Sequence, residues 1–384
     1  MTVNISKPSI NIREKLSELD KPSGIAGEAV LRADSVQEIR SQIGAGRKNL
    51  IINGGMQIAQ RGILATDIDS NKYTTVDRFI GEHDPTYYTI NTEQVADSPN
   101  GFDHSFKVSV TAVTGTPATS SYVIPFESRF ENSTLTPLSL GTSDSKPLSL
   151  SFWVKSNDTG TKYVDFVLGG YYGGDRTLSK SYTIDTADVW EKKVIHLPPS
   201  PATIASLPPP NYNGLSIFWW MSAGTDFTSG TENPVWGPQV ATNRAPDMGS
   251  GAVSGSYYQM TGVQLELGSV ATDFEHRSYG EELALCQRYY QILDFTRSQL
   301  GVLHRATSSG AGLPYAFIPL TTTMRAYPSM TTSGTWGTGA DQAGTPTLYE
   351  TSYSNVTLRG NNGNIADGGA QWLRGGFCNF DAEL

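Results

Sequence analysis

Apolar and polar residues alternate strictly in several short stretches of this chain. The clearest example is residues 148–155, where the apolar positions are Leu148, Leu150, Phe152 and Val154, and the polar ones include Ser149, Ser151 and Lys155. The same period of two recurs in residues 106–110, 122–126, 164–168, 190–197 and 215–221. It is typical of antiparallel strands that bury one face and leave the other polar. The pattern predicts an all-β protein whose body is a jelly-roll β-sandwich of eight to ten strands.

The stretch 257–290 joins a strand to a helix. Its alternation predicts one face with Tyr257, Val263, Leu265 and Leu267, and another with Tyr258, Gly262, Gln264 and Glu266. Ser278 followed by Glu281 is a capping box that opens a helix. Helical spacing then aligns Leu283, Cys286, Tyr290 and Leu293 on one side. We therefore expect a hinge helix over 278–298, with Cys286 as a small buried apolar residue.

Three further segments complete the predicted organisation. Residues 1–47 contain a possible helix from Ser35 to Ile43, which is too short to be stable alone and must pack on a partner. Residues 48–277 form the predicted jelly roll. Residues 299–384 read as a small C-terminal β-domain with strands near 314–320, 354–358 and 371–380, and its core is small for its surface.

Composition excludes several classes of protein. The chain has 384 residues with a net charge of −9, and this acidity disfavours adhesion to nucleic acid. No apolar run is long enough for membrane insertion, and the N-terminus lacks the apolar core of a signal peptide, so synthesis in a cytoplasm is expected. Two cysteines form neither a disulfide framework nor a zinc motif.

The sequence gives no clear sign of catalysis. Nucleophile elbows, HExxH, Walker loops and dinucleotide-binding glycine motifs are all missing. Glycoside hydrolysis needs two nearby acids, for which Asp165 with Asp175 or Glu127 with Glu131 are the candidates. The loop 156–160 lacks the dense acidic pattern of a calcium site. We expect no enzyme activity, no metal and no cofactor.

Sugar binding fits the sequence better, because flat sugar faces stack on aromatic rings while hydroxyl groups bond to polar side chains. A glycine-rich loop carries Tyr171, Tyr172, Asp175 and Arg176. Trp220 alternates away from Leu215, Ile217 and Trp219, which predicts a solvent-facing indole, and Trp236 lies in a Pro/Gly loop. These six residues, Tyr171, Tyr172, Asp175, Arg176, Trp220 and Trp236, are the predicted carbohydrate site. The alternative for each tryptophan is packing in the core or between subunits.

Several motifs resemble a group of bacteriophage tail-fibre and receptor-binding proteins. They are GVQLELG at 262–268, DFEHR at 273–277, YGEELALCQRYY at 279–290, NLIINGG at 49–55, QRG at 60–62, DRF at 77–79 and DAEL at 381–384. The resemblance implies a carbohydrate-binding-module-like jelly roll, a hinge and a smaller β-domain. It also implies a homotrimeric fibre in the virion, made in the host cytoplasm, that binds a host-cell glycan. Residues 1–47 would dock on tail or baseplate proteins. The alternatives are a head-attached structural fibre with little adhesive role and a polysaccharide depolymerase.

Overall fold

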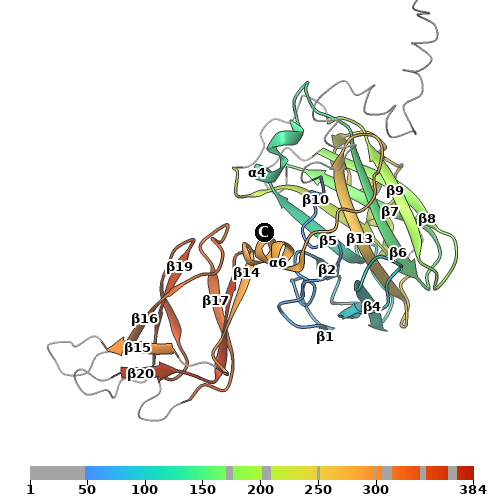
Figure 1. The fold of residues 1–384 in the computed structure, drawn as a ribbon. Helices are drawn as coiled ribbons and strands as arrows, with labels where there is room; N and C mark the ends of the chain where they lie inside the picture. The colour runs from blue at the N-terminus through green and yellow to red at the C-terminus, as the bar shows by residue number, and fades with distance from the viewer. Residues whose placement is uncertain are drawn as a thin grey trace, which may run out of the picture.

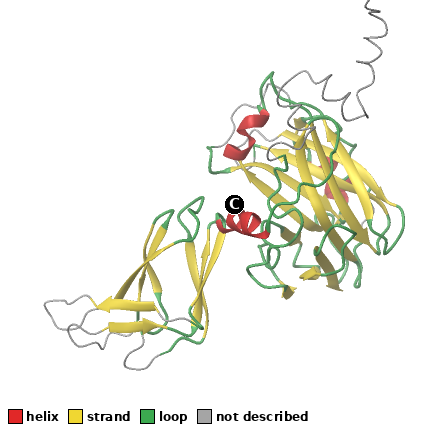
Figure 2. Ribbon diagram, in the orientation of Figure 1, coloured by secondary structure: helices red, strands yellow, loops and turns green. Residues whose placement is uncertain are grey.

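The computed structural model describes residues 48–169, 176–200, 209–248, 251–297, 300–304, 314–337, 343–361 and 370–384, so the predicted attachment segment 1–47 lies outside it. The described chain consists mostly of strands (Figure 2), which confirms the prediction of an all-β fold. Figure 1 shows a larger body in blue to yellow and a smaller one in orange to red, joined through a single helix.

The larger body is a sandwich of two antiparallel sheets. The first sheet has the order β1-β3-β4-β13-β6-β9, with β1 Leu64–Ile68, β3 Tyr88–Val95, β4 Ser105–Val113, β13 Tyr257–Leu267, β6 Leu148–Ser156 and β9 Glu191–Leu197. The second has the order β11-β5-β10-β7-β8-β12, with β11 Ser222–Ala223, β5 Tyr122–Glu131, β10 Asn213–Trp220, β7 Gly160–Leu168, β8 Arg176–Ile184 and β12 Gly237–Pro238. Strand β2 (Ile80–His83) pairs with β5. Short helical turns are α4 Asn132–Leu135, η1 Thr136–Leu138, α5 Thr225–Thr228 and η3 Ala241–Asn243.

One hydrophobic cluster fills the space between these two sheets. The rings of Phe106 on β4 and Phe126 on β5 lie 5.3 Å apart, and those of Phe152 on β6 and Trp219 on β10 lie 5.9 Å apart. Both pairs join opposite sheets. The apolar side of residues 148–155 therefore faces the core, as the pattern predicts. In 122–126 the predicted face is wrong, because Val123 and Phe126 are in this core, whereas Tyr122 and Ile124 pack on the other side of the sheet with Trp220.

The predicted alternation in β13 is wrong in its first half. Tyr258 is buried in the core, whereas Tyr257 is on the outer side, yet Val263 and Leu265 are again in the core. The pairing of β13 with β6 shifts between Thr261 and Gln264, and Gly262 has a φ of 62°. A bulge adds one residue to the strand, so the two halves of the alternation are out of phase.

The hinge helix is shorter than the predicted range 278–298. Helix α6 spans Tyr279–Gln287, and the Ser278 hydroxyl accepts a hydrogen bond from the Glu281 amide at 3.3 Å, as the capping box predicts. Tyr290 instead begins strand β14, Tyr290–Asp294. Pairing of β14 with β21 supplies tertiary hydrogen bonds that a helix ending in aromatic and β-branched residues could not match. Cys286 is fully buried, as expected.

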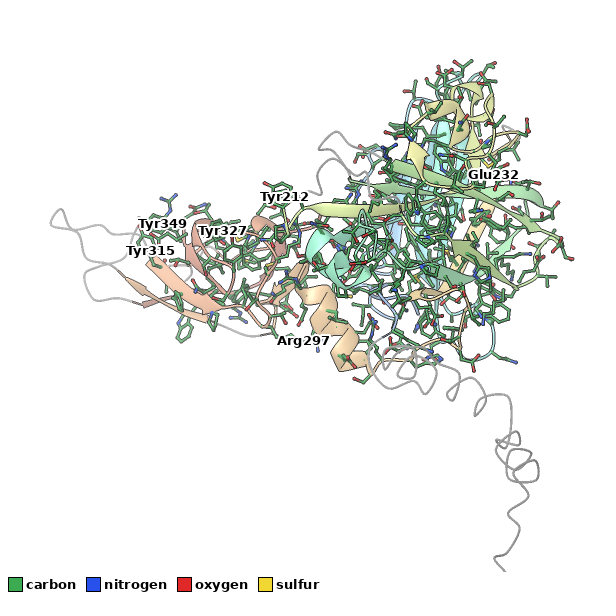
Figure 3. The ribbon with its side chains drawn as sticks, turned by 90° about the horizontal axis from the view of Figure 1, so that it is seen from above. Tyr212, Glu232, Arg297, Tyr315, Tyr327 and Tyr349 are labelled. Carbon is green, nitrogen blue, oxygen red and sulfur yellow. The ribbon has the colours of Figure 1, made fainter. Side chains whose placement is uncertain are left out.

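The smaller body contains two antiparallel sheets. One has the order β14-β21-β17, with β21 Gly376–Asp381 and β17 Ser329–Gly334. The other has the order β18-β19-β16-β15-β20, with β18 Thr347–Thr351, β19 Asn355–Arg359, β16 Pro314–Pro319, β15 Leu300–His304 and β20 Ala370–Leu373. The single strand predicted at 371–380 is thus two strands in different sheets. Seen from above (Figure 3), the labelled Tyr315, Tyr327 and Tyr349 lie along one edge of this body.

Candidate functional site

The predicted sugar-binding residues do not form one site among the described residues. Tyr171, Tyr172 and Asp175 lie outside the described residues. Arg176 opens β8, where its backbone pairs with Pro238. Trp220 and Trp236 are only 1% and 8% exposed. Neither indole face is open to a ligand in this structure.

Trp220 does lie on the side of β10 opposite Trp219, but a second layer covers that side. The segment containing α5 and η3 folds over it, so that Trp220 packs with Phe227, at 5.1 Å between rings, and with Ala245 and Met248. The Arg244 guanidinium lies 4.9 Å from the centre of the indole. The expectation of a solvent-facing indole is therefore wrong, because strand alternation does not reveal what packs on each side.

Trp236 is likewise part of the structural core. Its indole belongs to the main hydrophobic cluster, and its N–H donates a hydrogen bond to the Pro198 carbonyl at 3.0 Å. A buried indole with its single donor satisfied has a packing role. The alternative interpretation stated for the tryptophans thus fits both Trp220 and Trp236.

Three other aromatic side chains lie partly exposed on the outer side of the first sheet. They are Trp153 on β6, Trp190 just before β9, and Tyr257 on β13. The neighbouring outward positions are polar: Gln259 on β13 is paired with Lys107 on one side and Lys155 on the other. We call the set Trp153, Trp190, Tyr257, Asp97, Lys107, Lys155 and Gln259 the outer aromatic face.

Asp97 joins several residues of the outer aromatic face. Its carboxylate accepts hydrogen bonds from Lys155 Nζ at 2.7 Å, from Trp190 Nε1 at 3.2 Å and from Gln259 Nε2 at 3.3 Å. Partial burial acts to raise the pKa of Asp97, but the bonds from Lys155 and Trp190 outweigh it and lower the pKa. Asp97 therefore stays ionised at neutral pH and fixes the orientation of the Trp190 ring.

Tyr257 is also held from two sides. Its hydroxyl donates to the Asp188 carboxylate, and the Lys107 ammonium lies 4.9 Å from the centre of its ring. Nearby, Trp153 contacts the bulge, since a methyl group built on Gly262 would be 3.0 Å from its ring and 2.6 Å from that of Phe102. Rings held in fixed orientations beside polar groups are suited to stacking on sugars, because little side-chain freedom is lost on binding.

Sequence reasoning missed the outer aromatic face, although one signal for it was available. Trp153 falls between Phe152 and Val154, both of which the alternation assigns to the core, so Trp153 had to point outward. Tyr257 could not be found in this way, because the bulge at Gly262 reverses the phase of its strand.

Of the two acidic pairs proposed for hydrolysis, Asp165 with Asp175 cannot be placed because Asp175 lies outside the described residues, and Glu127 with Glu131 is not assembled. Glu127 and Glu131 are four residues apart on β5, about 13 Å at the usual rise per residue, and each pairs with a different arginine. Asp165 is buried against Arg244, with 2.6 Å between its Oδ2 and the arginine Nε. The structure instead brings Glu82 to Glu127, where they interact by a side-chain hydrogen bond. Both acids also contact Arg129.

Within the described part of the chain, no group of three or more His, Cys, Asp or Glu residues is arranged to hold a metal ion, and no helix is long and apolar enough to cross a membrane. In the loop 156–160, Asp158 pairs with Lys162 at 2.6 Å. A hollow of about 410 Å³ lies at one end of the sandwich, and hydroxyl-bearing residues such as Thr116, Thr119 and Ser254 line it.

No model of a known protein family matches the chain, and a search of curated proteins finds no match either. Among solved structures, the chain is similar to the enzymatically active domain of tailspike protein 4 from bacteriophage CBA120, with 14% identity, a TM-score of 0.29 and coverage of 57% of this chain and 21% of the tailspike. It is also similar to a family 11 carbohydrate-binding module from Clostridium thermocellum, with 14% identity, a TM-score of 0.27 and coverage of 55% and 97%. The CBM22-2 xylan-binding domain of Paenibacillus barcinonensis Xyn10C is similar with 13% identity and a TM-score of 0.27, and the match covers 53% of this chain and 98% of that domain. The chain thus spans about a fifth of the tailspike domain, and similarities this distant do not bear on function.

Proposed function

We propose that this protein is a structural fibre protein of a bacteriophage virion, a tail fibre whose sandwich binds glycans on the host surface. The motifs at 49–79 and 257–290 support the class of protein, since they resemble those of tail-fibre and receptor-binding proteins. In this proposal the fibre is a homotrimer, and residues 1–47 dock it on tail or baseplate proteins. Light scattering that gives a stable monomer at micromolar concentration would contradict the trimer.

The outer aromatic face is the observation that carries the binding function. It presents partly exposed rings next to a carboxylate and two ammonium groups, and the orientations of Trp190 and Tyr257 are fixed by these neighbours. These are the groups that stack on sugar rings and bond to sugar hydroxyls. The face is a shallow surface on a sheet, which suits a ligand that is a long surface polysaccharide.

The binding free energy of one such site is small, and the presence of several sites on one fibre compensates for it. A stacked ring contributes about 1 kcal/mol, and a site of millimolar affinity needs only about 4 kcal/mol in total. Several sites on one fibre increase the effective affinity by roughly 100-fold or more when the geometry permits simultaneous contact. A fibre therefore functions with weak single sites and without a deep pocket.

The test combines binding with a matched control. Purified protein is first screened on a glycan array, and affinity for the best ligand is then measured by calorimetry. Replacing both Trp153 and Trp190 by Ala removes two rings, about 2 kcal/mol, so binding should weaken roughly 30-fold. Tyr279→Ala removes a ring that is 60% exposed on α6, outside the face, and should bind as the wild type does.

Two outcomes would contradict this proposal. Unchanged affinity in a folded Trp153→Ala/Trp190→Ala variant would exclude the outer aromatic face. Tyr171→Ala/Tyr172→Ala, measured in the same assay, then tests the loop predicted from the sequence. Release of reducing sugar ends from host polysaccharide by the purified protein would instead favour a depolymerase.

A further inference from the structure

The segment 381–384 leaves the end of β21 and inserts between the sandwich and α6. In Figure 1 the C-terminus lies next to α6, between the two bodies. The segment reads Asp-Ala-Glu-Leu, so two acids alternate with two apolar residues. Arginines from both bodies surround it.

Arg61 contacts both acids of this segment. Its guanidinium lies 3.2 Å from a carboxylate oxygen of Asp381 and 3.2 Å from one of Glu383, and it stacks 3.6 Å from the centre of the Tyr290 ring. The side chain is only 8% exposed. A guanidinium this buried needs anionic partners, and Asp77 at 3.4 Å supplies a third.

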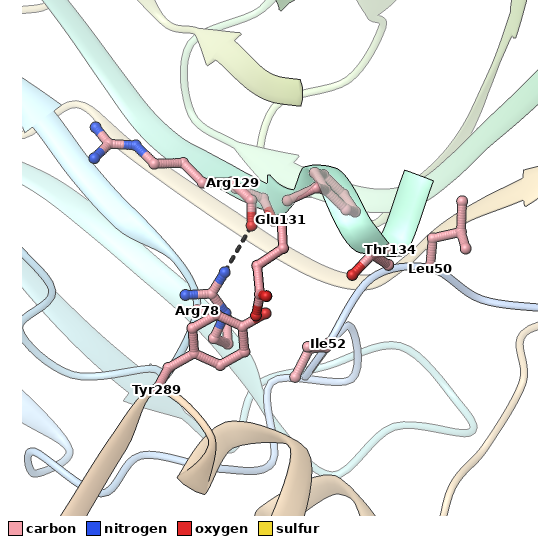
Figure 4. Close-up of a pocket in the computed structure, with 9 residues that line it drawn as sticks. Leu50, Ile52, Arg78, Arg129, Glu131, Thr134 and Tyr289 are labelled. Atoms are coloured by element: carbon pink, nitrogen blue, oxygen red, sulfur yellow. Dashed lines mark hydrogen bonds between the residues drawn. The ribbon is translucent and has the colours of Figure 1, made fainter. Parts of the chain in front are cut away.

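Arg78 holds Glu383 from the opposite side. It forms an ion pair with the Glu383 carboxylate and donates to the Arg129 carbonyl at 2.6 Å. It also lies 3.5 Å from the centre of the Tyr289 ring. Figure 4 shows Arg78 against Tyr289, with its bond to Arg129 dashed, at the edge of a small cavity of about 10 Å³. Arg78 is 2% exposed and Glu383 6%, so this pair is removed from water.

The backbone of the segment is also bound. Arg325 donates to the carbonyls of Ala382 and Glu383 at 2.6 and 2.7 Å, and Arg129 donates to that of Leu384 at 2.7 Å. The Ala382 amide donates to the Tyr289 carbonyl at 2.8 Å, which continues the pairing of β21 with β14. Arg325 and Tyr289 lie outside the sandwich, so the sandwich itself binds the two acidic side chains and the Leu384 carbonyl.

The hydrophobic packing shows why this contact matters. The main core of the sandwich and the core of the C-terminal body are separate clusters that share no residue. The contact between the bodies is instead made of charged and aromatic groups. Polar contacts of this type usually permit relative motion of domains unless specific bonds prevent it.

We propose that Arg61, Arg78 and Arg129 form a docking site on the sandwich for an acidic peptide of the form acid–x–acid, followed by a residue whose carbonyl Arg129 binds. The chain's own residues 381–384 occupy this site and hold the C-terminal body in place. Because the segment is bound as a peptide would be, a separate peptide of the same sequence competes for the site. This inference does not depend on glycan binding.

The test uses a fluorescent peptide with the sequence of residues 379–384, measured by anisotropy against the full chain. In the variant Asp381→Asn/Glu383→Gln the internal segment has lost its charges, so the peptide should bind at least tenfold more tightly than to the wild type. Adding Arg78→Met to that variant should weaken peptide binding at least tenfold. Arg297→Met, an exposed arginine outside the site, is the matched control and should have no effect.

A second measurement uses the wild-type chain and needs no variant. Excess peptide added to the wild-type chain should shift the carboxylate ¹³C resonance of Glu383 toward that of an exposed glutamate, because this carboxylate contacts Arg61 and Arg78 only while the segment is docked. A peptide with Asn and Gln in place of the two acids should leave the resonance unchanged. Equal effects of the acidic and amide peptides, or equal binding with and without Arg78, would overturn the docking site.

Discussion

Replacing Gly262 by Ala tests whether the bulge in β13 positions the outer aromatic face. Gly262 has a φ of 62°, in the left-handed region that costs an L-residue about 1–2 kcal/mol. A new methyl group would be 2.6 Å from Phe102 Cζ and 3.0 Å from Trp153 Cδ1, so both rings must move. Phe102 is only partly buried and can shift, which limits the added cost to about 1 kcal/mol.

Gly262→Ala is therefore expected to lower the free energy of unfolding by about 2–3 kcal/mol in total. For a body of this size, each kcal/mol lowers the melting temperature by roughly 2–4 °C, which predicts a decrease of about 4–12 °C. The assay is thermal unfolding followed by circular dichroism, together with glycan affinity, which should fall because Trp153 is displaced.

Gly280→Ala provides the matched control for the same chemical change. Gly280 lies in α6, has no atom within 4 Å of an added methyl group, and its φ is not in the left-handed region. Alanine is better than glycine in a helix by up to about 1 kcal/mol, so this variant should be as stable as the wild type or slightly more stable. If Gly262→Ala melted at the wild-type temperature, the strained bulge would not be needed and the reasoning would be refuted.

Two further predictions concern charges buried on the second sheet. Arg244→Met leaves the fully buried Asp165 without its partner and should lower the free energy of unfolding in urea by about 3–5 kcal/mol. Adding Asp165→Asn should restore most of this stability. A double variant as unstable as Arg244→Met alone would contradict this prediction. Burial, and after it the adjacent Glu127, raises the pKa of Glu82 in the folded protein. Protonated Glu82 therefore makes its full contribution to the free energy of unfolding below pH about 4. This contribution is lost as the pH rises from there through the raised pKa of the folded state. Glu82→Gln should remove this loss, and an unchanged alkaline slope of stability in the variant would refute the assignment.

Much of the local structure follows from the chain itself. The alternation in 148–155 assigns the core side of β6 correctly, because a strand with one buried face repeats every two residues. The Ser278 and Glu281 capping box sets the start of α6, because a helix needs its first amides satisfied locally. These signals depend only on neighbouring residues, and for that reason they can be read from the sequence.

The binding surfaces depend on contacts between residues that are distant in the sequence. Asn49 accepts a hydrogen bond from the Leu265 amide, 216 positions away, and Arg78 pairs with Glu383, 305 positions away. The alternation placed Trp220 on the correct side of β10 but could not reveal the layer from α5 and η3 that covers it. The sequence determined which residues alternate and where the helix begins. Only the tertiary structure decided which outward side chains meet solvent and which charges are buried together, because burial is set by the segments that pack on each side.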